Sequence, residues 1–561
     1  MNLYGLGLSA LLNAQQNLQT TGHNINNSAI EGYSRQTVLS QTQGANATGA
    51  GYIGRGIQTV TIQRAYDQFL NQQLMTSKGK HAEYVSYGNE IDQLNNLFSD
   101  REAGVSPALQ AFFGALQAVA SSPDDAAARQ ELLGRAQNLA TQLKETDTFI
   151  ENQRGNLNTQ ISTLTYQINS YVKRIHDLNE QITKAQAATP NHAPNDLLDQ
   201  RDQLLMELNE FVEVKSFEQD GRLNLTLSSG QLLLSGSTIH ELRAIPSTND
   251  PSRHVLAYQT QSNEGAQWIE MDDAAIKGGE LGGLLRYRTQ TLDAAQNALG
   301  RLAIGIGQSI NEVHRQGIDL DGAAGEDLFY FRIGQGLPLS GVGYPAEVSG
   351  LSVELKEADA LALRDYRIEA QHDADGTFKG LAFFDAQSGA LIPAEQHQDN
   401  NGPYYLVDGL KVHLPDSNTP MGAQWSLQPT RRGADSFGVD LDDPAKIAAG
   451  LPDSGPSNGD NALALAALQN QQILGQGSLN FNDAFGQLVN RVAVQTQENT
   501  VAIKAQDNLV QQSFAAQQRV SGVNLNEEYL LLEQYVEQFR AASKLIDVGT
   551  AMFDTLLGLR P

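Results

Sequence analysis

The chain has 561 residues, of which 40% are hydrophobic, so it is long enough for two or more domains with sizeable cores. It carries 64 Asp and Glu against 38 Lys and Arg, and the net charge of −26 disfavours nucleic acid and anionic lipid as partners. Cysteine is absent, which excludes a disulfide framework, a thiolate metal site and a cysteine nucleophile.

Each end of the chain predicts a helix with a narrow apolar stripe, because key positions alternate by three and four. The N-terminal stripe is Tyr4, Leu8, Leu11, Gln15, Leu18, Gly22 and Ile25. The C-terminal stripe is Leu532, Tyr535, Phe539, Ala542, Ile546, Gly549, Phe553 and Leu556. Matching stripes at opposite ends indicate that the chain closes on itself. Periodicity alone is equally typical of ordinary amphipathic helices, so both interpretations remain open here.

The sequence contains no signal for the membrane or for classical secretion. No apolar run approaches the roughly 20 residues needed to span a bilayer. The first Lys or Arg is Arg35, so the charged n-region of a secretory signal is missing. By these rules alone the protein is expected to stay in the cytoplasm.

The passage after the N-terminal helix indicates a hinge. Residues 44–56 are rich in Gly, Ala and Thr, which favours a mobile loop. Val60 and Ile62 then alternate with polar residues as a short strand does, and residues 64–74 return to helix formers.

Residues 84–214 are almost wholly helical in pattern. A long apolar stripe from Leu157 to Ile182 predicts one extended helix that ends before Pro190. A second helix begins at Asn195, where Asn195 or Asp196 is expected to cap the free backbone N–H groups. The two helices predict an antiparallel hairpin.

The second half of the chain predicts mixed structure. A β-hairpin is expected around Leu223–Leu234, and a helix follows from Gly282 to Val313. Residues 351–429 alternate strand patterns with Asp-Gly, Ser-Gly and Asn-Gly turns, so this stretch predicts a β domain inserted between helices. Helices resume over residues 461–474 and 483–519.

The fold class is therefore multidomain and mainly α: terminal coiled-coil helices, a domain of long helical hairpins and an inserted all-β domain. We expect residues 1–62 and 520–561 to form a discontinuous coiled-coil domain. Residues 63–345 and 430–519 form the long-helix domain, with a β-hairpin region at about 213–275. Residues 346–429 form the β domain.

No motif in the chain predicts catalysis, a metal site or a cofactor. His240-Glu241 begins a zinc-protease motif, but Ala244 stands where the second histidine is required. Asp319 to Gly322 lacks the glycine and glutamate spacing of a calcium loop and predicts a turn instead. The acidic residues of the β domain could include a glycosidase pair, although a solvated acidic surface is favoured.

Two terminal segments carry a family resemblance. Residues 23–36 read HNINNSAIEGYSRQ, and residues 521–528 read SGVNLNEE. Together they resemble the hook-associated protein 1 (FlgK) family of bacterial flagellar axial proteins, as do the strings at 195–202 and 282–322. Asn26, Ile30, Asn526 and Phe539 depart from the usual family residues. The signature positions are Asn24, Asn27, Gly32, Tyr33, Arg35, Gly522, Val523, Asn524, Glu527 and Glu528.

The resemblance implies a structural, non-enzymatic subunit joining hook to filament. It implies export as an unfolded chain through the flagellar type III system without a cleaved signal peptide, and a place outside the cell. The implied partners are copies of the chain in a tubular ring, the hook protein, the second junction protein and a cytoplasmic chaperone that binds the C-terminal helix. The implied assembly residues are Tyr4, Leu8, Leu11, Leu18, Ile25, Leu532, Tyr535, Phe539, Ala542, Ile546, Phe553 and Leu556.

A different class remains open from the residues themselves. A secreted coiled-coil adhesin, or a stalk that carries a carbohydrate-active β module, is also compatible with long helices around a β domain. A paired N-terminal helix discriminates between these classes, because a tube-forming subunit needs it and an adhesin stalk does not.

Overall fold

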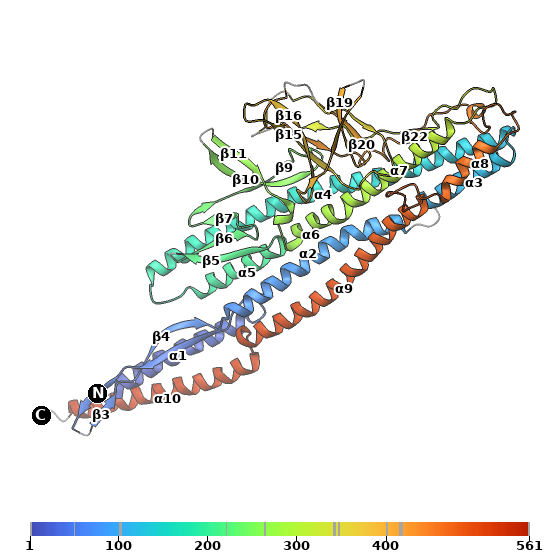
Figure 1. Cartoon of the computed structure of the whole chain (residues 1–561). Coiled ribbons are helices and arrows are strands. Elements are labelled where there is room, and N and C mark those ends of the chain that lie inside the picture. The colour runs from blue at the N-terminus through green and yellow to red at the C-terminus, as the bar shows by residue number, and fades with distance from the viewer. Residues whose placement is uncertain are drawn as a thin grey trace.

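The computed structural model describes residues 3–49, 51–99, 104–219, 221–262, 265–339, 344–345, 348–399, 402–414 and 419–558. The molecule is elongated, and both termini lie at the same end (Figure 1). The α-helices are α1 (Leu3–Asn27), α2 (Gln68–Phe98), α3 (Val105–Ser121), α4 (Ala126–Ala188), α5 (Asn195–Phe211), α6 (Gly279–Tyr287), α7 (Asp293–His314), α8 (Asp460–Ala467), α9 (Phe481–Ser521) and α10 (Leu525–Gly558).

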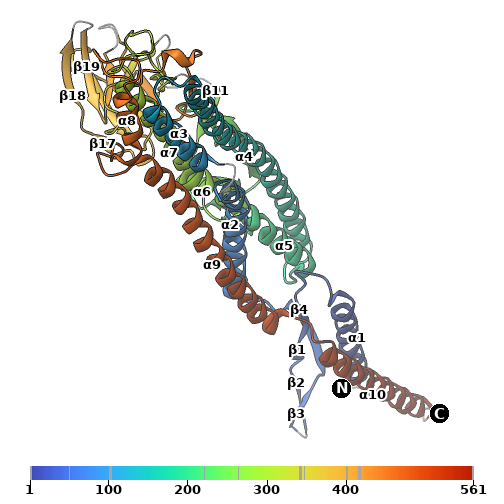
Figure 2. The same ribbon diagram turned by 90° about the vertical axis from the view of Figure 1, so that its right-hand side faces the viewer.

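Three regions follow one another along the molecule. The terminal pair, α1 with α10, lies at one end, and next to it a ribbon of strands follows α1 (Figure 2). The body comprises residues 65–521 and contains the other helices. Two of its sheets cover one side of these helices, towards the end of the body away from the terminal pair (Figures 1 and 2). None of the described helices is both long enough and apolar enough to cross a membrane.

Helix α4 has 63 residues and runs along most of the body (Figure 1). Asp125 caps its first turn by accepting from Ala127 N, and the helix ends at Ala188 ahead of Pro190, as the sequence predicts. Its apolar stripe, including Leu157 and Ile182, is buried. Helix α5 begins at Asn195 and returns alongside α4.

The predicted cap of α5 is wrong. Pro194 occupies the N-cap position and makes no side-chain cap bond. Asn195 and Asp196 instead bond to Ile62 and Gln36 in the ribbon, so tertiary contacts take the side chains that local capping would use.

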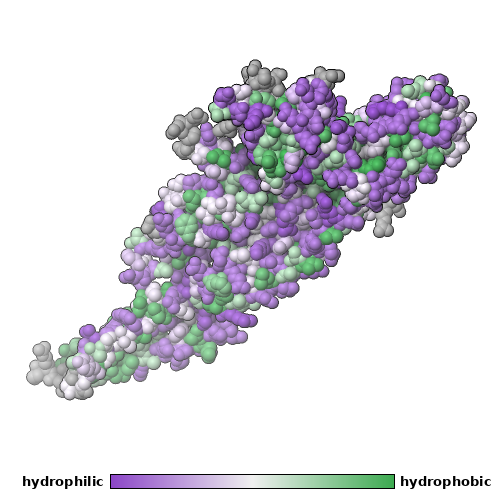
Figure 3. Space-filling model, viewed as in Figure 1, coloured by the Kyte–Doolittle hydropathy of each residue, from purple (hydrophilic) through white to green (hydrophobic). Residues whose placement is uncertain are grey.

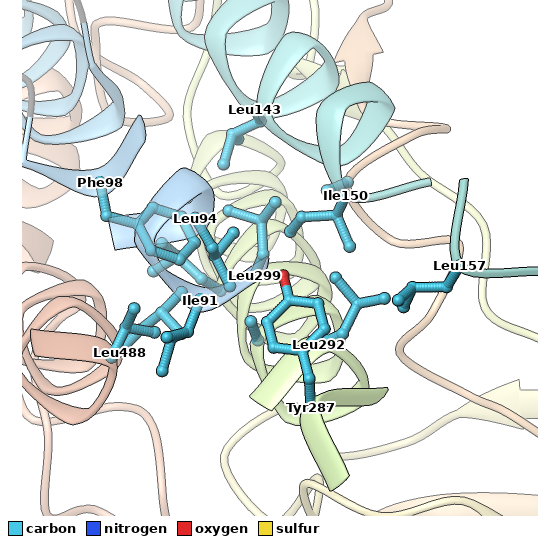
Figure 4. Packing of buried hydrophobic residues seen from close by; sticks show 14 of the residues in the cluster. Ile91, Leu94, Phe98, Leu143, Ile150, Leu157, Tyr287, Leu292, Leu299 and Leu488 are labelled. Carbon is cyan, nitrogen blue, oxygen red and sulfur yellow. The ribbon is translucent and has the colours of Figure 1, made fainter. Parts of the chain in front are cut away.

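One apolar core runs through the body. Figure 4 shows how side chains of α2, α4, α7 and α9 converge there, with Leu94, Ile150 and Leu299 all fully buried. Tyr287 joins the same core, and its hydroxyl donates to Gln153 Oε1. Burying one side chain of this size stabilises the folded state by about 1.5–3 kcal/mol. The core therefore contributes strongly to the stability of the body.

The helix predicted from Gly282 to Val313 is interrupted. Residues Arg288–Leu292 form a π-helical turn between α6 and α7. Arg288 is fully buried there and bonds to His254 O and Asp273 Oδ2. The turn therefore places a buried cation where the pattern alone predicts a regular helix.

Small antiparallel sheets line the body beside α4 and α5 (Figure 1). The predicted hairpin at Leu223–Leu234 is confirmed as β6 and β7. The strands are β5 (Val214–Gln219), β6 (Arg222–Leu227), β7 (Leu232–Ser235) and β8 (Thr238–Ile239) in one sheet and β9 (Leu242–Pro246), β10 (His254–Ser262) and β11 (Gly265–Glu270) in another.

Two further sheets pack around a separate core that includes Trp425, Tyr366 and Phe383. The five-stranded sheet comprises β13 (Leu337–Pro338), β21 (Gln424–Leu427), β15 (Tyr366–His372), β16 (Phe378–Asp385) and β17 (Leu391–Ile392). The four-stranded sheet comprises β14 (Val353–Leu355), β20 (Leu410–His413), β19 (Gly402–Val407) and β18 (Glu395–Asp399). A two-stranded sheet of β12 (Phe329–Tyr330) and β22 (Gly438–Val439) lies at the boundary with the helices.

Buried ion pairs link these sheets to the β9–β10 loop, and that loop to the start of α7. Arg431 bonds to Asp250 and, at 2.8 Å, to Asp365 beside β15. Asp293 at the start of α7 pairs with Arg154 of α4 at 2.9 Å and with Arg253. The surrounding cations hold the pKa of Asp250 down to about 2 despite its burial.

Two sequence expectations fail in the loops. The stretch expected to be a mobile loop, 44–56, contains the hairpin of β2 (Ala45–Thr48) and β3 (Gly51–Gly54), whose turns use glycines with positive φ at Gly44, Gly51 and Gly56. The helix expected over 461–474 ends as α8 at Ala467, followed by a single 3-10 turn over Leu468–Asn470.

Candidate functional site: the joint of the terminal pair

Helices α1 and α10 pack antiparallel and very closely. A Cβ added at Gly7 would lie 2.8 Å from Ile546 Cγ1, and one at Gly549 would lie 2.8 Å from Tyr4 N. Two glycines, one on each helix, therefore let the backbones approach at these points. The pairing of both ends of the chain agrees with the prediction that the chain closes on itself.

The N-terminal stripe differs from the predicted one at Tyr4, Leu8 and Gln15, which are exposed. Gly7, Ala14 and Thr21 are buried, whereas Leu8 is 40% exposed and Gln15 is exposed. Tyr4 is also exposed, while Leu11, Leu18 and Ile25 are half-buried. The three–four alternation placed Leu8, Gln15 and Gly22 in the seam, but close helix approach requires small side chains one residue earlier.

The C-terminal stripe lies along α10 as predicted for most of its length. Ala542 and Gly549 are buried, and Leu532, Tyr535, Phe539 and Ile546 are half-buried. Phe553 is 51% exposed, because it lies near the end of α10 beyond Gly549, which already contacts Tyr4 at the start of α1. Leu556 is part of α10, but its side chain lies outside what the structure describes.

A second face of α1 is polar and packs on the ribbon. The ribbon pairs β1 (Gln36–Thr42) with β4 (Ile57–Arg64) and continues into the β2–β3 hairpin. Asn13 of α1 donates to Ser40 Oγ at 2.5 Å and Thr59 Oγ1 at 3.0 Å. Asn24 likewise donates to Gln36 O, and Asn17 Nδ2 donates to Asn13 O and Asn13 Oδ1 within the helix, so buried amides help to orient α1 on the strands.

Signature residues from both ends of the chain meet where the terminal pair reaches the body. Glu528 of α10 is 1% exposed and accepts from Arg35 Nε at 2.7 Å and from Asn24 Nδ2 at 3.1 Å. Asn24 Oδ1 in turn accepts from Tyr33 Oη at 2.7 Å and from Gln36 N at 2.9 Å. One buried carboxylate therefore ties α1, α10 and the ribbon together.

The body completes this joint with a row of carboxylates on α5. Asp196, Asp199 and Asp202 are spaced three apart, so they share one face of the helix. Arg64 of β4 bonds to Asp199 at 2.7 Å and Asp202 at 2.8 Å. Ser34 N donates to Asp199 Oδ2, and Gln36 Nε2 donates to Asp196 Oδ1.

We call this set the joint residues. They are Asn24, Tyr33, Ser34, Arg35, Gln36, Arg64, Asp196, Asp199, Asp202 and Glu528. Two backbone bonds reinforce them: Arg35 N donates to Ser521 O at 2.8 Å, and Ala65 N donates to Arg35 O at 2.7 Å. All the contacts are polar, so the joint is directional.

The remaining signature residues shape the chain around the joint. Gly32 has φ 82°, and a Cβ there would lie 2.7 Å from Gln203 Oε1, so both conformation and space require glycine. Gly522 ends α9, and Asn524 Oδ1 accepts from Asn526 N at the start of α10. Asn27 Nδ2 donates to His23 O, Val523 is half-buried, and Glu527 lies 3.4 Å from Arg35.

Burial sets the electrostatics of the joint. It raises the pKa of Tyr33 well above its usual range, helped by the charges of Asp196, Asp199 and Glu528. Burial also raises the pKa of Asp199, although Arg64 and Ser34 N oppose the shift. Tyr33 is therefore fixed as a neutral hydrogen-bond donor at physiological pH.

Within the described residues, no group of three or more His, Cys, Asp or Glu side chains is placed to hold a metal ion. A groove of about 610 Å³ opens beside the joint and is lined by side chains including Tyr33, Arg174, Asp196 and Glu207.

Asp319, the rejected calcium-loop residue, accepts from the N–H groups of Asp321 and Ala323 and makes the expected turn.

Comparisons with known proteins agree with these features. Residues 91–329 match the model of the flagellar hook-associated protein FlgK helical domain. The chain is 34% identical to flagellar hook-associated protein 1 of Salmonella typhimurium and 33% identical to that of Escherichia coli, with full coverage of each chain. The flagellar hook junction protein FlgK of Burkholderia pseudomallei shares the fold, with a TM-score of 0.72 and 24% identity over 80% of this chain and all of that one.

These matches define a structural protein of the bacterial flagellum. The chain belongs to the flagellar hook-associated protein 1 (FlgK) family. It therefore has a structural role at the hook–filament junction, outside the cell.

Proposed function

We propose that copies of this chain form a tubular ring through their terminal pairs, which act as coiled coils in the assembly. The observation that carries this proposal is the apolar surface left on the pair. Leu8, Leu12, Leu545, Val548, Met552 and Phe553 are each at least 40% exposed. Figure 3 shows hydrophobic residues reaching the surface at the end of the molecule where the pair lies.

Packing against further copies explains this exposure. A single pair of helices with glycine and alanine at its contact buries little apolar surface, so it gains much of its stability from neighbours. The exposed residues Tyr4, Leu8 and Phe553, which the α1–α10 contact leaves uncovered, are then assembly residues, as are the half-buried ones. An adhesin stalk gives no reason for an N-terminal helix that pairs with the C-terminal one.

The joint has a distinct role in this proposal. A ring requires every subunit to hold its terminal pair at a defined angle to its body, and directional hydrogen bonds achieve this better than apolar contact. Glu528 and Asp199 each bind groups from two other elements, so they fix three segments at once.

The domain arrangement follows the same logic. We propose an inner coiled-coil domain of residues 1–62 and 520–561, a long-helix domain of residues 63–345 and 430–519, and a β domain of residues 346–429 that projects outward. The hook protein would lie beneath the ring, and the second junction protein above it. This arrangement assigns scaffolding to every domain and enzymatic activity to none.

We further propose that the chain leaves the cell unfolded through the flagellar type III system, without a cleaved signal peptide. A cytoplasmic chaperone would bind α10 beforehand. The exposed residues Leu545, Val548 and Met552 support this, because an apolar helix face needs cover until assembly.

Immunogold labelling of isolated flagella tests the proposed place of the protein. We expect gold confined to a narrow band between hook and filament. Label along the whole filament, or on the cell surface away from flagella, would contradict the proposal.

A further inference from the structure

Helix α9 changes character half-way along its 41 residues. Its buried residues are Phe481, Phe485, Leu488 and Val492 in the half next to the core. From Asn499 onward they are Asn499, Gln506, Ser513 and Ser521, all of which are polar. The helix is continuous, so the difference lies in what holds each half to its neighbours.

The partner along this helix is α2, which runs antiparallel to it (Figures 1 and 2). In the core half, Phe98 packs edge-on against Phe485, with ring centroids 6.1 Å apart. In the other half, Asn499 Nδ2 donates to Tyr84 O at 2.9 Å, and Gln506 Nε2 donates to Ser77 O at 3.0 Å. Asn499 and Gln506 are one heptad apart, as are Tyr84 and Ser77, so the register is constant while the contact becomes polar.

Arg286 lies where the core half of α9 ends and contacts both α9 and α2. It donates to Asn499 Oδ1 at 2.9 Å, pairs with Glu83 at 2.9 Å and lies over the ring of Tyr87 at 4.1 Å. Gly88 allows the approach, because a Cβ there would lie 2.9 Å from Asn499 Nδ2. Beyond Arg286, towards Ser521, the described residues of α9 and α2 form no comparable cluster.

The apolar contacts of residues 500–521 with the body are partial: Ile503 and Val510 are half-buried, and a Cβ at Gly88 of α2 would lie 3.3 Å from Ile503 Cδ1. In this stretch, all of which the structure describes, no apolar side chain is buried. Val501, Leu509, Phe514 and Val520 are each at least 40% exposed. The side-chain bonds that hold this stretch to α2 are those of Gln506 and Ser513, the latter 3.4 Å from Ser77 Oγ.

We propose that residues 500–521 form a strap that opens from α2 as one unit while the body stays folded. A segment with few buried apolar contacts opens at low free energy, whereas the core half of α9, on the other side of Arg286, does not. The strap ends at Ser521, whose carbonyl accepts from Arg35 N in the joint. Its opening therefore removes one of the connections between the terminal pair and the body, while the bonds of Arg64 and Ser34 to Asp199 remain. The proposal concerns the isolated subunit and does not depend on the assembly proposed above.

Hydrogen exchange on the purified chain tests the strap directly. We expect amides of residues 500–521 to exchange at least tenfold faster than those of residues 481–497, once intrinsic rates are removed. Equal protection along the whole of α9 would overturn the proposal.

A reversible lock tests whether the stretch moves as a unit. Because the chain has no cysteine, a Ser77→Cys/Ser513→Cys variant has only this thiol pair. Oxidation should slow exchange throughout residues 500–521 by at least tenfold and leave residues 481–497 unchanged; reduction should restore the fast rate. An effect limited to the residues next to position 513, or a disulfide that fails to form, would contradict a docked strap that opens as one body.

A matched pair of substitutions tests the polar contact itself. Gln506→Leu places an apolar side chain at the buried position, so the strap should exchange several-fold more slowly. Gln512→Leu makes the same chemical change at an exposed position of the same helix and should leave the rates within twofold of the wild-type values. Equal effects of the two variants would show that the buried amide does not set the opening.

Discussion

Asp147 is a buried carboxylate on α4 whose ionisation opposes folding. Burial raises its pKa to about 7, and the charges of Asp435 and Glu151 act in the same direction. The bond from Gln296 Nε2 and the nearby Arg154 act against the shift. Because the folded-state pKa lies above the unfolded one, the contribution of Asp147 to stability is fully present below about pH 4 and is lost as pH rises towards 7.

Asp147→Asn should therefore stabilise the helical body at pH 8. The variant keeps an oxygen for Gln296 but carries no charge, so we expect a gain of about 1–3 kcal/mol at pH 8 and almost none at about pH 3, below the pKa of an unfolded aspartate. Denaturant unfolding at both pH values measures this. Asp177→Asn, at an exposed position of the same helix, is the control. A gain that is the same at both pH values would disprove the explanation.

Glu528 and Glu527 are neighbours with very different environments. Glu528 is 1% exposed and bonds to Arg35 and Asn24, whereas Glu527 is 58% exposed. Glu528→Ala leaves Arg35 without its buried partner, so the free energy that holds the joint together should fall by about 3–5 kcal/mol. Glu527→Ala should cost about 0–1 kcal/mol.

Hydrogen exchange of α10 and of the last turns of α1 separates these two variants. Exchange that is faster than in the unaltered chain for Glu528→Ala alone supports the joint. Comparable exchange in both would mean that Glu528 does not hold the terminal pair in place.

At the scale of elements, Gly7 and Gly5 provide a matched test of the terminal pair. A Cβ at Gly7 meets Ile546, whereas one at Gly5 meets nothing within 4 Å. Gly7→Leu should separate α1 from α10 and cost about 1–3 kcal/mol of pairing. Gly5→Leu should be neutral or slightly stabilising, because leucine favours helix. Limited proteolysis of the two variants gives the readout, and equal cleavage rates would exclude a close contact at Gly7.

The sequence predicted helices well where one face of the helix carries a continuous stripe of large apolar side chains. The stripe of α4 and its end before Pro190 follow from apolar period and proline chemistry, which are local properties. The N-terminal seam was misplaced because close helix contact selects Gly7 and Ala14 over the larger Leu8. The β2–β3 hairpin was missed because its glycine-rich turns have the composition of a loop.

The joint could be predicted only in part. Signature residues Asn24, Arg35 and Glu528 were singled out by family resemblance, and the structure brings them together. Arg64 and Ser34, which bind Asp199, were missed, because these partners lie more than 100 positions away in sequence. The three-residue spacing of Asp196, Asp199 and Asp202 on one helix face is the signal that could have indicated a polar interface.

At the scale of the whole molecule, the β sheets have a core of their own. Gly334 N donates to Pro429 O at 3.1 Å, so the chain enters and leaves this region at adjacent points. Deleting residues 335–428 should leave the helical body folded, since its core includes Leu94, Ile150 and Leu299. Circular dichroism should show a cooperative helical transition, and filament attachment should persist. Loss of attachment with normal export would contradict the proposed domain arrangement.

The terminal pair should also be the least stable region of the isolated subunit. Ordering it costs about 1–2 kcal/mol per residue in backbone entropy, and its apolar contacts remain incomplete until subunits assemble. Hydrogen exchange should show residues 3–60 and 520–558 poorly protected and residues 84–214 well protected. Equal protection throughout would mean that the pair does not depend on neighbours.

The most direct test of the central claim is the fate of an Ile546→Asp variant in flagellated cells. Ile546 lies against Gly7 in the terminal pair, so the charge enters a contact repeated in every subunit and should cost several kcal/mol there. Lys544→Asp, at an exposed position of α10, is the control.

The measurement is the amount of protein retained at the hook tip relative to the amount secreted into the medium. We expect Ile546→Asp to lower retention much more than secretion and Lys544→Asp to lower neither. Normal retention and filament growth with Ile546→Asp would show that the terminal pair is not the assembly surface.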